Sequence, residues 1–291
     1  MNTNDLSLFE AVAHHGNFTK AAEAMFTVQS NVTARIKNLE EEFGTPLFFR
    51  SSRKVELTPA GEILIQYSKQ INYLINDAKR SIGKSDVIKG QIKIGFLETM
   101  MTLKGPGLVD ELALKFPFVD LEFKSAMRDT LINDVINFRL DAAFVPAPLQ
   151  IPELEYIEIG NEKIVVVAPA NCESLDDLLK KNPLKAIVFD QGCVFRARLE
   201  AWLVTKGIFQ CHKTVMNSIE GVVNFIESGI GFSFLPEEIV TTFYGSRNIK
   251  TFPLPKEIGL IKTLLIFRKD IPASPALKAF ISLYDSRNNT K

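Results

Sequence analysis

The residues with the most recognisable chemistry near the start of the chain stand in the segment QSNVTARIK, residues 29–37. If residues 28–43 form a helix, Ser30, Thr33 and Lys37 lie on the side opposite an apolar stripe. The major groove of DNA accepts a helix, and there Gln or Asn pairs with adenine and Arg or Lys with guanine. The expected base-reading side chains are Gln29, Ser30, Asn31, Thr33, Arg35 and Lys37.

Composition alone favours another interpretation of this segment, a helix face that is simply solvated. The stretch PLFFRSSRKVELT, residues 46–58, favours the DNA-reading one, because β-prone runs flank Ser51-Ser52 as in a small hairpin or wing. Basic side chains on a wing can hold phosphates, which supplies affinity and register but reads no sequence. The expected phosphate contacts are Thr19, Lys20, Arg50, Arg53 and Lys54.

Three short helices are predicted to position these side chains. Residues 5–15 carry apolar side chains at helical spacing and end at Gly16, and Asn17 or Thr19 can cap the next helix. The apolar stripe of the third helix consists of Val32, Ile36, Leu39 and Phe43. Three helices followed at once by a basic hairpin are the arrangement of a winged helix-turn-helix.

A longer helix is predicted after the hairpin, with Thr58 as its cap and Pro59 in its first turn. Its apolar residues alternate steps of three and four, which is typical of the seam of a coiled coil. The expected dimerisation residues are Leu64, Tyr67, Ile71, Leu74 and Ala78. Because the seam covers only about two heptads, a helix packed on its own chain stays open as an alternative.

From about residue 90 the pattern changes to alternating strands and helices. Strands are predicted at QIKIGF, VDLEFKSA, LDAAFVPA, KIVVVAPA, KAIVFDQ, GFSFLP, TLLIFRK and near Val215. Helices are predicted over 103–116, 129–139, from Ser174, and over 194–206, 218–228 and 275–285. This alternation predicts parallel sheets with right-handed crossovers. Two rounds of it predict two α/β lobes.

The segment NFTKAAEAMFTVQSNVTARIKNLEEEFGTPLFFRSSRKVELTPAGE closely resembles the N-terminal domain of the LysR-type transcriptional regulators. The shared pattern is an aromatic-Thr-x-Ala-Ala-Glu, a Gln-led recognition helix, Leu-Glu-x-x-Leu/Phe-Gly, x-Leu-Phe-x-Arg and Leu-Thr-x-Ala-Gly. Chain length and the following α/β region extend the resemblance over the whole sequence. One position departs from it, because Val28 stands where these proteins often place Ser or Thr as the cap of the recognition helix.

The resemblance implies a multidomain chain: an all-α winged helix-turn-helix DNA-binding domain, a long linker helix, and a two-lobed α/β effector-binding domain similar to periplasmic binding proteins of type 2. The implied ranges are 1–58 for DNA binding, 59–89 for the dimerising helix and hinge, and 90–291 for the effector domain. Within the last, lobe I takes about 90–160 and 266–291, and lobe II about 161–265. The implied partners are promoter DNA with an inverted repeat, a small-molecule effector, RNA polymerase, and further copies of the chain in a dimer or tetramer.

The resemblance also implies an effector cleft between the lobes, with LETMMT (97–102) as the effector loop and Thr99 where a Ser or Thr commonly contacts the ligand. Arg128 can neutralise a carboxylate there, although a surface salt bridge is its other interpretation. The expected effector-binding residues are Thr99, Met101, Thr102, Arg128, Gln191, Cys193 and Phe195. Hydroxyls beside an apolar wall suggest a small, partly apolar organic anion.

Several classes of protein are disfavoured by the same sequence. Net charge is zero, so any contact with nucleic acid depends on local placement of charge. No run approaches the ~18 apolar residues of a membrane span, and the N-terminus lacks a signal-peptide pattern, which predicts a cytoplasmic protein. The motifs of nucleotide-binding, hydrolase and metal sites are missing. We therefore expect no enzyme, no cofactor and no metal.

The three cysteines, Cys172, Cys193 and Cys211, match neither a disulfide framework nor a metal-ligand set. A thiol at a helix N-terminus can have a lowered pKa, so a redox-responsive regulator that uses Cys193 is one alternative. Peroxide-sensing relatives use a close pair of cysteines, and the spacing here is wide, which favours an inert thiol. A cytoplasmic solute-binding protein is the other alternative, and the fusion to a helix-turn-helix disfavours it.

Overall fold

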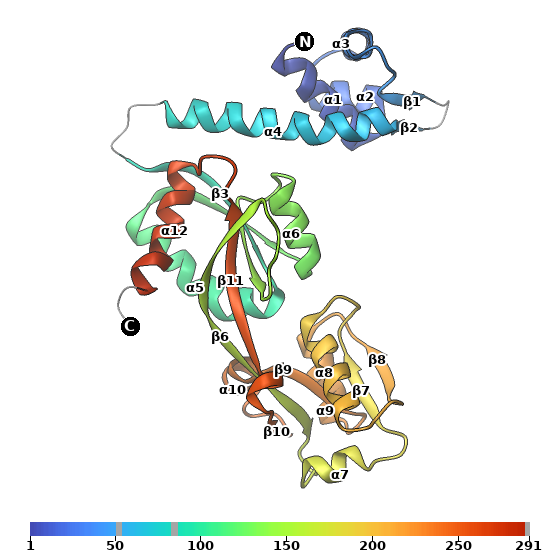
Figure 1. The fold of residues 1–291 in the computed structure, drawn as a ribbon, viewed down its shortest axis with the longest axis vertical. Helices are drawn as coiled ribbons and strands as arrows, with labels where there is room; N and C mark the ends of the chain where they lie inside the picture. Colours follow the sequence, from blue (N-terminus) through green and yellow to red (C-terminus); the bar gives the residue numbers. More distant parts are fainter. Residues whose placement is uncertain (51–53, 83–86, 289–291) are drawn as a thin grey trace. The chain divides into compact units, whose positions relative to one another are not determined.

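A computed structural model describes residues 1–50, 54–82 and 87–288 of the chain. The chain divides into two compact units, Met1–Asp86 and Val87–Lys291, and each is described by itself (Figure 1). The expected linker helix belongs to the first unit, so the division falls after this helix rather than before it.

Three helices open the first unit: α1 (Thr3–His15), α2 (Phe18–Ala24) and α3 (Gln29–Phe43). Asn17 caps α2, because its side-chain oxygen accepts hydrogen bonds from the N–H groups of Thr19 and Lys20. Val32, Ile36 and Leu39 are buried against α1 and α2 as predicted. Phe43 does not belong to this core, since it is 45% exposed at the last position of the helix, before Gly44 ends it in a left-handed conformation.

The predicted wing is present as the antiparallel pair β1 (Phe48–Arg50) and β2 (Val55–Leu57). The tip of the hairpin, with Arg53, lies outside the described residues. Helix α4 (Pro59–Ser81) follows, and the hydroxyl oxygen of Thr58 caps it by accepting a hydrogen bond from the N–H of Gly61.

The apolar residues of α4 lie in two environments: some pack in the core of the first unit, and the others are exposed. Leu64 is buried in the core of its own unit, which contradicts its expected place on a dimer surface, whereas Ile71 is half-buried and packs only partly against that core. The same side of the helix buries Ser68, whose hydroxyl donates to Glu10 on α1 at 2.6 Å. A helix needs such a face to stay attached to its own domain. The remaining apolar face of α4 is exposed and consists of Ile63, Tyr67, Leu74 and Ala78.

The turn between α2 and α3 stores backbone strain at Phe26, which has φ 52° although it is not glycine. Its side chain is 98% exposed, so the phenyl ring contributes almost no packing. A left-handed residue with a Cβ costs about 1 kcal/mol. We expect Phe26→Gly to raise the free energy of unfolding by up to about 1 kcal/mol, measured by urea denaturation of the whole chain.

The matched control is Val28→Gly, two residues away, where φ is −100° and the side chain is also exposed. Glycine relieves no strain there and adds freedom to the unfolded chain, so a loss of about 0.5 to 1 kcal/mol is expected. Equal losses in both variants would contradict a strained turn.

The second unit is built on one sheet with the strand order β10-β6-β11-β5-β3-β4, and β9 also pairs with β6. Its strands are β3 (Lys89–Phe96), β4 (Phe118–Ser125), β5 (Ala142–Pro146), β6 (Leu154–Pro169), β9 (Ser233–Pro236), β10 (Ile249–Pro253) and β11 (Leu260–Arg268), with β7 (Lys185–Val188) and β8 (His212–Val215) in a separate pair. Its helices are α5 (Glu98–Lys115), α6 (Arg128–Ile136), α7 (Leu175–Leu179), α8 (Val194–Thr205), α9 (Ile219–Glu227), α10 (Glu237–Phe243), α11 (Lys256–Gly259) and α12 (Pro275–Asn288).

Two lobes share this sheet, because β6 and β11 run from one lobe into the other (Figure 1). Lobe I has its core among α5, α12 and the strands β3 and β5, with Phe96, Phe144 and Phe280 at its centre. The core of lobe II surrounds Trp202 and Phe234. On β6 the change of core falls between 159 and 164, around Gly160.

The structure corrects three expectations for this unit. The sheets are mixed: β3 is parallel to β4 and β5, whereas β11 is antiparallel to β5 and β6. Helix α5 starts at Glu98 rather than at 103, because the burial of Met100 fixes its first turn against lobe I. Helix α6 ends at Ile136, and Phe138 follows with φ 58°. The elements α10, β10 and α11 were not predicted.

Candidate functional site

Helix α3 presents the expected base-reading residues in two groups. Gln29 and Ser30 are exposed at its N-terminal end, Thr33 is half-buried, and Lys37 is exposed with only a 3.5 Å ion pair to Glu41 one turn further on. No side-chain hydrogen bond caps the N-terminus at Val28. Free N–H groups at such an end favour an anion. This side of α3 can meet a DNA groove and its phosphates.

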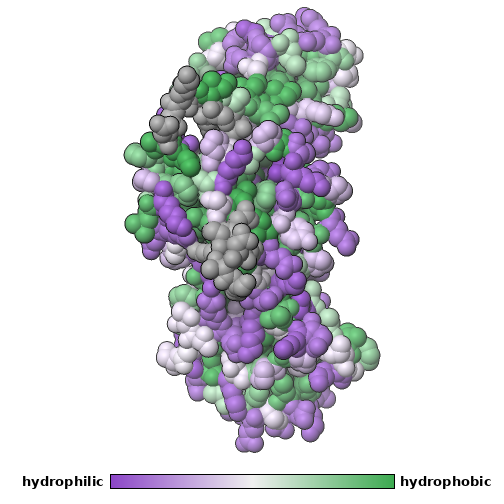
Figure 2. Space-filling model, turned by 60° about the vertical axis from the view of Figure 1, so that its left-hand side comes forward, coloured by the Kyte–Doolittle hydropathy of each residue, from purple (hydrophilic) through white to green (hydrophobic). Residues whose placement is uncertain are grey.

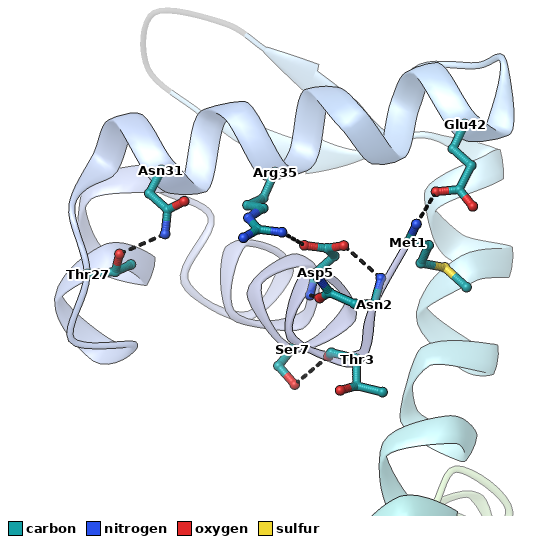
Figure 3. Close-up of polar contacts among 9 residues, drawn as sticks. All are labelled: Met1, Asn2, Thr3, Asp5, Ser7, Thr27, Asn31, Arg35 and Glu42. Atoms are coloured by element: carbon teal, nitrogen blue, oxygen red, sulfur yellow. Dashed lines mark hydrogen bonds and ion pairs between the residues drawn. The ribbon is translucent and has the colours of Figure 1, made fainter.

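Asn31 and Arg35 lie on the other flank of α3, and both have partners within the protein (Figure 3). The side-chain amide of Asn31 donates to the hydroxyl oxygen of Thr27 at 2.9 Å. The guanidinium of Arg35 donates to Asp5 Oδ1 at 3.0 Å. Asn31 and Arg35 therefore differ from the group of Gln29, Ser30, Thr33 and Lys37, because contacts with the turn before α3 and with α1 hold their side chains.

The expected phosphate contacts differ in whether their side chains already have partners within the protein. Thr19 and Lys20 are exposed, and only their N–H groups are used, to cap α2. Arg50 pairs with Glu40 at 2.6 Å and lies over the ring of Phe18, 5.2 Å from its centroid. Lys54 pairs with Glu56 at 2.5 Å. Thr19 and Lys20 are therefore the residues of this set whose side chains are held by no contact described above, and of the two Lys20 carries the positive charge.

The second unit has a cavity of about 310 Å³ between its lobes. Thr99 and Arg128 line it from lobe I, and Cys193 and Phe195 line it from lobe II. The hydroxyl oxygen of Thr99 is buried and has no hydrogen-bond partner among the described residues, and the residue is 3% exposed. A buried hydroxyl without a partner costs free energy, so a ligand that bonds it is favoured.

Three helices begin at this cavity without a side-chain cap. Their N-cap residues, Leu97 of α5, Met127 of α6 and Cys193 of α8, all line it, and none makes a capping hydrogen bond. By contrast, Ser218 caps α9 in the usual way. Uncapped N-termini carry unpaired N–H groups and partial positive charge. Their convergence makes the cavity suitable for an anion.

Other expected effector residues lie elsewhere or are already occupied. Met101 and Thr102 do not line this cavity, and Thr102 is exposed with its hydroxyl donating to the carbonyl of Glu98. Gln191 is also exposed and outside the lining. Arg128 does line the cavity, but its guanidinium donates to the carbonyl oxygens of Pro146 and Pro148 and pairs with Asp129. It braces lobe I.

Sequence reasoning missed several lining residues, including Glu98, Met127, Phe189, Asp190 and Asn217. They stand at strand ends and helix starts, which is the feature that could have found them. Burial raises the pKa of Glu98 above its ordinary value.

Comparisons with known proteins agree with this geometry. Residues 3–62 match the family described as bacterial regulatory helix-turn-helix protein, lysR family, and residues 85–288 match the LysR substrate binding domain. The HTH-type transcriptional regulator CzcR of Bacillus subtilis (strain 168) is 33% identical over 289 residues, which cover 99% of each chain. The chain belongs to the LysR family.

Other relatives and solved structures share the layout of this LysR-family chain. The HTH-type transcriptional regulator GltR of Bacillus subtilis (strain 168) is 30% identical over 282 residues, 97% of this chain and 95% of that one. A full-length OxyR variant from Pseudomonas aeruginosa has a TM-score of 0.74 at 21% identity and covers 98% of this chain and 94% of its own. Full-length CbnR complexed with its target DNA has a TM-score of 0.69 at 20% identity, with 98% and 99% covered.

The cysteines of this LysR-family regulator are free thiols. Burial raises the pKa of Cys193, against smaller lowering effects from the N–H groups of Arg196 and Phe195. The thiolate is the reactive form of cysteine. The structure therefore gives the redox alternative no support.

A second, larger cavity of about 800 Å³ lies beside the strands that join the lobes of this LysR-family domain. Glu162 of β6 lines it, and Oε1 of this residue is buried without a hydrogen-bond partner among the described residues. Burial, reinforced by the nearby carboxylate of Glu238, raises the pKa of Glu162 to about 7, while Lys104 opposes the shift. Lys104 and Glu238 also form a 2.8 Å ion pair between α5 and α10.

None of the described helices is both long and apolar enough to cross a bilayer. On the face that Figure 2 draws, hydrophilic and hydrophobic residues are mixed. The described part of the chain also holds no group of three His, Cys, Asp or Glu side chains placed to bind a metal ion.

Proposed function

We propose that this LysR-family regulator reads one half of an inverted-repeat promoter site through Gln29, Ser30, Thr33 and Lys37 of α3. The observation that carries this proposal is that these four side chains share one side of a helix with an uncapped N-terminus, where Gln29, Ser30 and Lys37 are exposed and Thr33 is half-buried. Amide, hydroxyl and ammonium groups suit base edges in the major groove. Lys20 and Arg50 supply contacts to phosphates, together with Arg53, which lies outside the described residues.

Gln29→Ala is expected to weaken binding to the promoter site about tenfold and to leave binding to random DNA nearly unchanged. The control is Lys20→Gln, which should weaken both by a similar factor and reduce the slope of log K against log salt by about 0.9. Fluorescence anisotropy with DNA from the promoter region of the chain's own gene measures both quantities. Equal affinity of the parent protein for promoter and random DNA would refute the proposal.

The exposed face of α4 supports the proposal that the regulator acts as a dimer. Ile63, Tyr67, Leu74 and Ala78 lie along one side of the helix, and an exposed apolar stripe of this kind matches a two-stranded helical contact. Two copies joined there bring two recognition helices to the two halves of an inverted repeat. We include a tetramer in the proposal, and membership of the family is its sole support.

The cavity between the lobes supports a small organic monoanion as the effector. Three uncapped helix N-termini and the hydroxyl of Thr99 provide donors for one carboxylate. Phe189, Phe195 and Ile219 provide an apolar wall for the rest of the ligand. Because Glu98 and Asp190 also line the cavity, a second negative charge is disfavoured. A ligand that binds two arrangements of the protein unequally shifts their populations, which couples the cavity to DNA binding.

Thr99→Val is expected to reduce the affinity for a carboxylate ligand at least tenfold, because one hydrogen bond to a charged group is lost at nearly constant volume. A thermal-shift screen of aliphatic and aromatic monocarboxylates identifies the ligand, and titration of parent and variant gives the ratio. Thr102→Val is the control, since this threonine lies one turn further along α5, outside the cavity. Equal stabilisation of the parent and Thr99→Val by every hit would exclude this site.

A further inference from the structure

The side chain of Asp5 joins the beginning of α1 to the middle of α3. One carboxylate oxygen accepts a hydrogen bond from the N–H of Asn2 at 2.8 Å, which completes the capping box of α1. The other oxygen accepts from the guanidinium of Arg35 at 3.0 Å (Figure 3). Both oxygens of the carboxylate are therefore used.

The burial of the two partners is unequal. The side chain of Asp5 is 9% exposed, and that of Arg35 is 39% exposed. A carboxylate this deeply buried needs a charged partner, because an uncompensated buried charge is strongly destabilising. Arg35 therefore stays paired with Asp5, because breaking the pair would leave a buried carboxylate without a charged partner. An arginine free to bind a guanine must project both terminal nitrogens into the groove.

We propose that Arg35 is a positioning residue: its ion pair with Asp5 fixes the orientation of α3 relative to α1, and the guanidinium does not read bases. This inference rests on the proposed role of α3 in reading DNA. It replaces the expectation that all six of the expected base-reading residues of α3 contact bases. Asn31, held by Thr27, anchors the same flank at the turn.

The proposal assigns the same consequence to the loss of either partner. Without Asp5 or without Arg35, α3 keeps its apolar packing through Val32, Ile36 and Leu39 and loses the Asp5–Arg35 ion pair to α1, while the ion pair between the amine of Met1 and Glu42 remains. Base contacts require placement within fractions of an ångström, whereas phosphate contacts tolerate small rotations. We therefore expect a loss of promoter affinity without a comparable loss of affinity for random DNA.

The test is a double-mutant cycle on the full chain, with promoter and random DNA at several salt concentrations. Asp5→Asn keeps an oxygen for the N–H of Asn2, and Arg35→Gln removes only the charged fork. Each is expected to weaken promoter binding about tenfold, and the double variant by no more than either single one, because coupled residues are not additive. The salt slope and the affinity for random DNA should match the parent.

Two further variants separate positioning from mere stability. Asp5→Glu keeps the carboxylate and a capping-box residue, so it should bind the promoter within about twofold of the parent. Glu111→Gln breaks a 3.0 Å ion pair with Lys115 in the second unit and should change neither affinity. Active fractions are fixed by stoichiometric titration, so that partial unfolding of a variant does not enter the comparison.

A loss in Arg35→Gln with parent-like binding by Asp5→Asn would overturn the proposal, because it would place the guanidinium on DNA. A salt slope reduced by about 0.9 in Arg35→Gln would overturn it in the same way. Failure of the parent protein to prefer the promoter would instead refute the proposed function on which the inference rests.

Discussion

Gly61→Ala is expected to lower the stability of the first unit by at least about 3 kcal/mol and to abolish promoter binding under conditions where the parent binds. A Cβ on Gly61 would lie 2.2 Å from the carbonyl oxygen of Leu47 and 2.9 Å from the side chain of Leu57. The carbonyl cannot yield easily, because it accepts a hydrogen bond from the N–H of Thr58 at 3.0 Å. The first turn of α4 and the root of the wing would have to separate.

The measurement is thermal unfolding of the full chain, followed by promoter binding at a temperature below the transition. In a unit of this size the expected loss lowers the transition by more than about 12 °C. Gly107→Ala in α5 is the matched control, since a Cβ at this helical glycine meets nothing within 4 Å. It should be neutral or stabilising by up to about 1 kcal/mol. A parent-like transition in Gly61→Ala would show that the wing root is loosely packed.

Glu162 is expected to make the stability of the second unit fall as the pH rises from about 5 to 7. The pKa of this carboxyl is about 7 in the folded chain and 4.5 is its ordinary value. Between these two values the folded state holds a proton that the unfolded state has released, so raising the pH favours unfolding. At 1.36 kcal/mol per unit, the loss reaches at most about 3 kcal/mol and is complete above the folded pKa.

Glu162→Gln should remove this pH dependence, because the amide stays neutral. Relative to the parent, the variant is expected to gain up to about 3 kcal/mol at pH 8 and almost nothing at pH 4.5. Urea denaturation at pH 4.5 and 8 gives the difference, in which all other titrating groups cancel. Glu238→Gln is the companion variant, since removing that neighbouring charge should lower the pKa of Glu162 and shrink the effect. Parallel stability profiles for parent and Glu162→Gln would contradict a neutral buried carboxyl.

Local sequence features predicted most of the first unit, because short-range physics determines it. Helix caps at Asn17 and Thr58, and the burial of Val32 and Ile36, follow from residues within one or two turns. The error at Leu64 has a different origin. An apolar stripe on α4 satisfies a coiled coil and an intramolecular core equally well, and only the position of α1 decides between them.

The cavity between the lobes was predictable as a region but less so as a set of lining residues. Thr99, Arg128 and Phe195 come from three separate segments; the rule about strand ends pointed to Arg128 and Phe195, and the family resemblance pointed to Thr99. Gln191 was expected in the lining but does not belong to it. Gly192, with φ 89°, turns the chain between Asp190 and Cys193, so that the glutamine side chain is exposed. A single left-handed glycine thus decides which neighbour enters the cavity.

The position of β11 in the sheet has a consequence for synthesis on the ribosome. Lobe II takes its core from a continuous stretch, Ile164 to Ile261, whereas lobe I needs the last strand and helix α12 to complete the core begun at Ile92. Because β11 lies between β5 and β6, the facing edges of these strands stay unpaired until nearly the whole chain has emerged. The lobe that is translated first is finished last, and the nascent protein must be kept from aggregating through those open edges in the meantime.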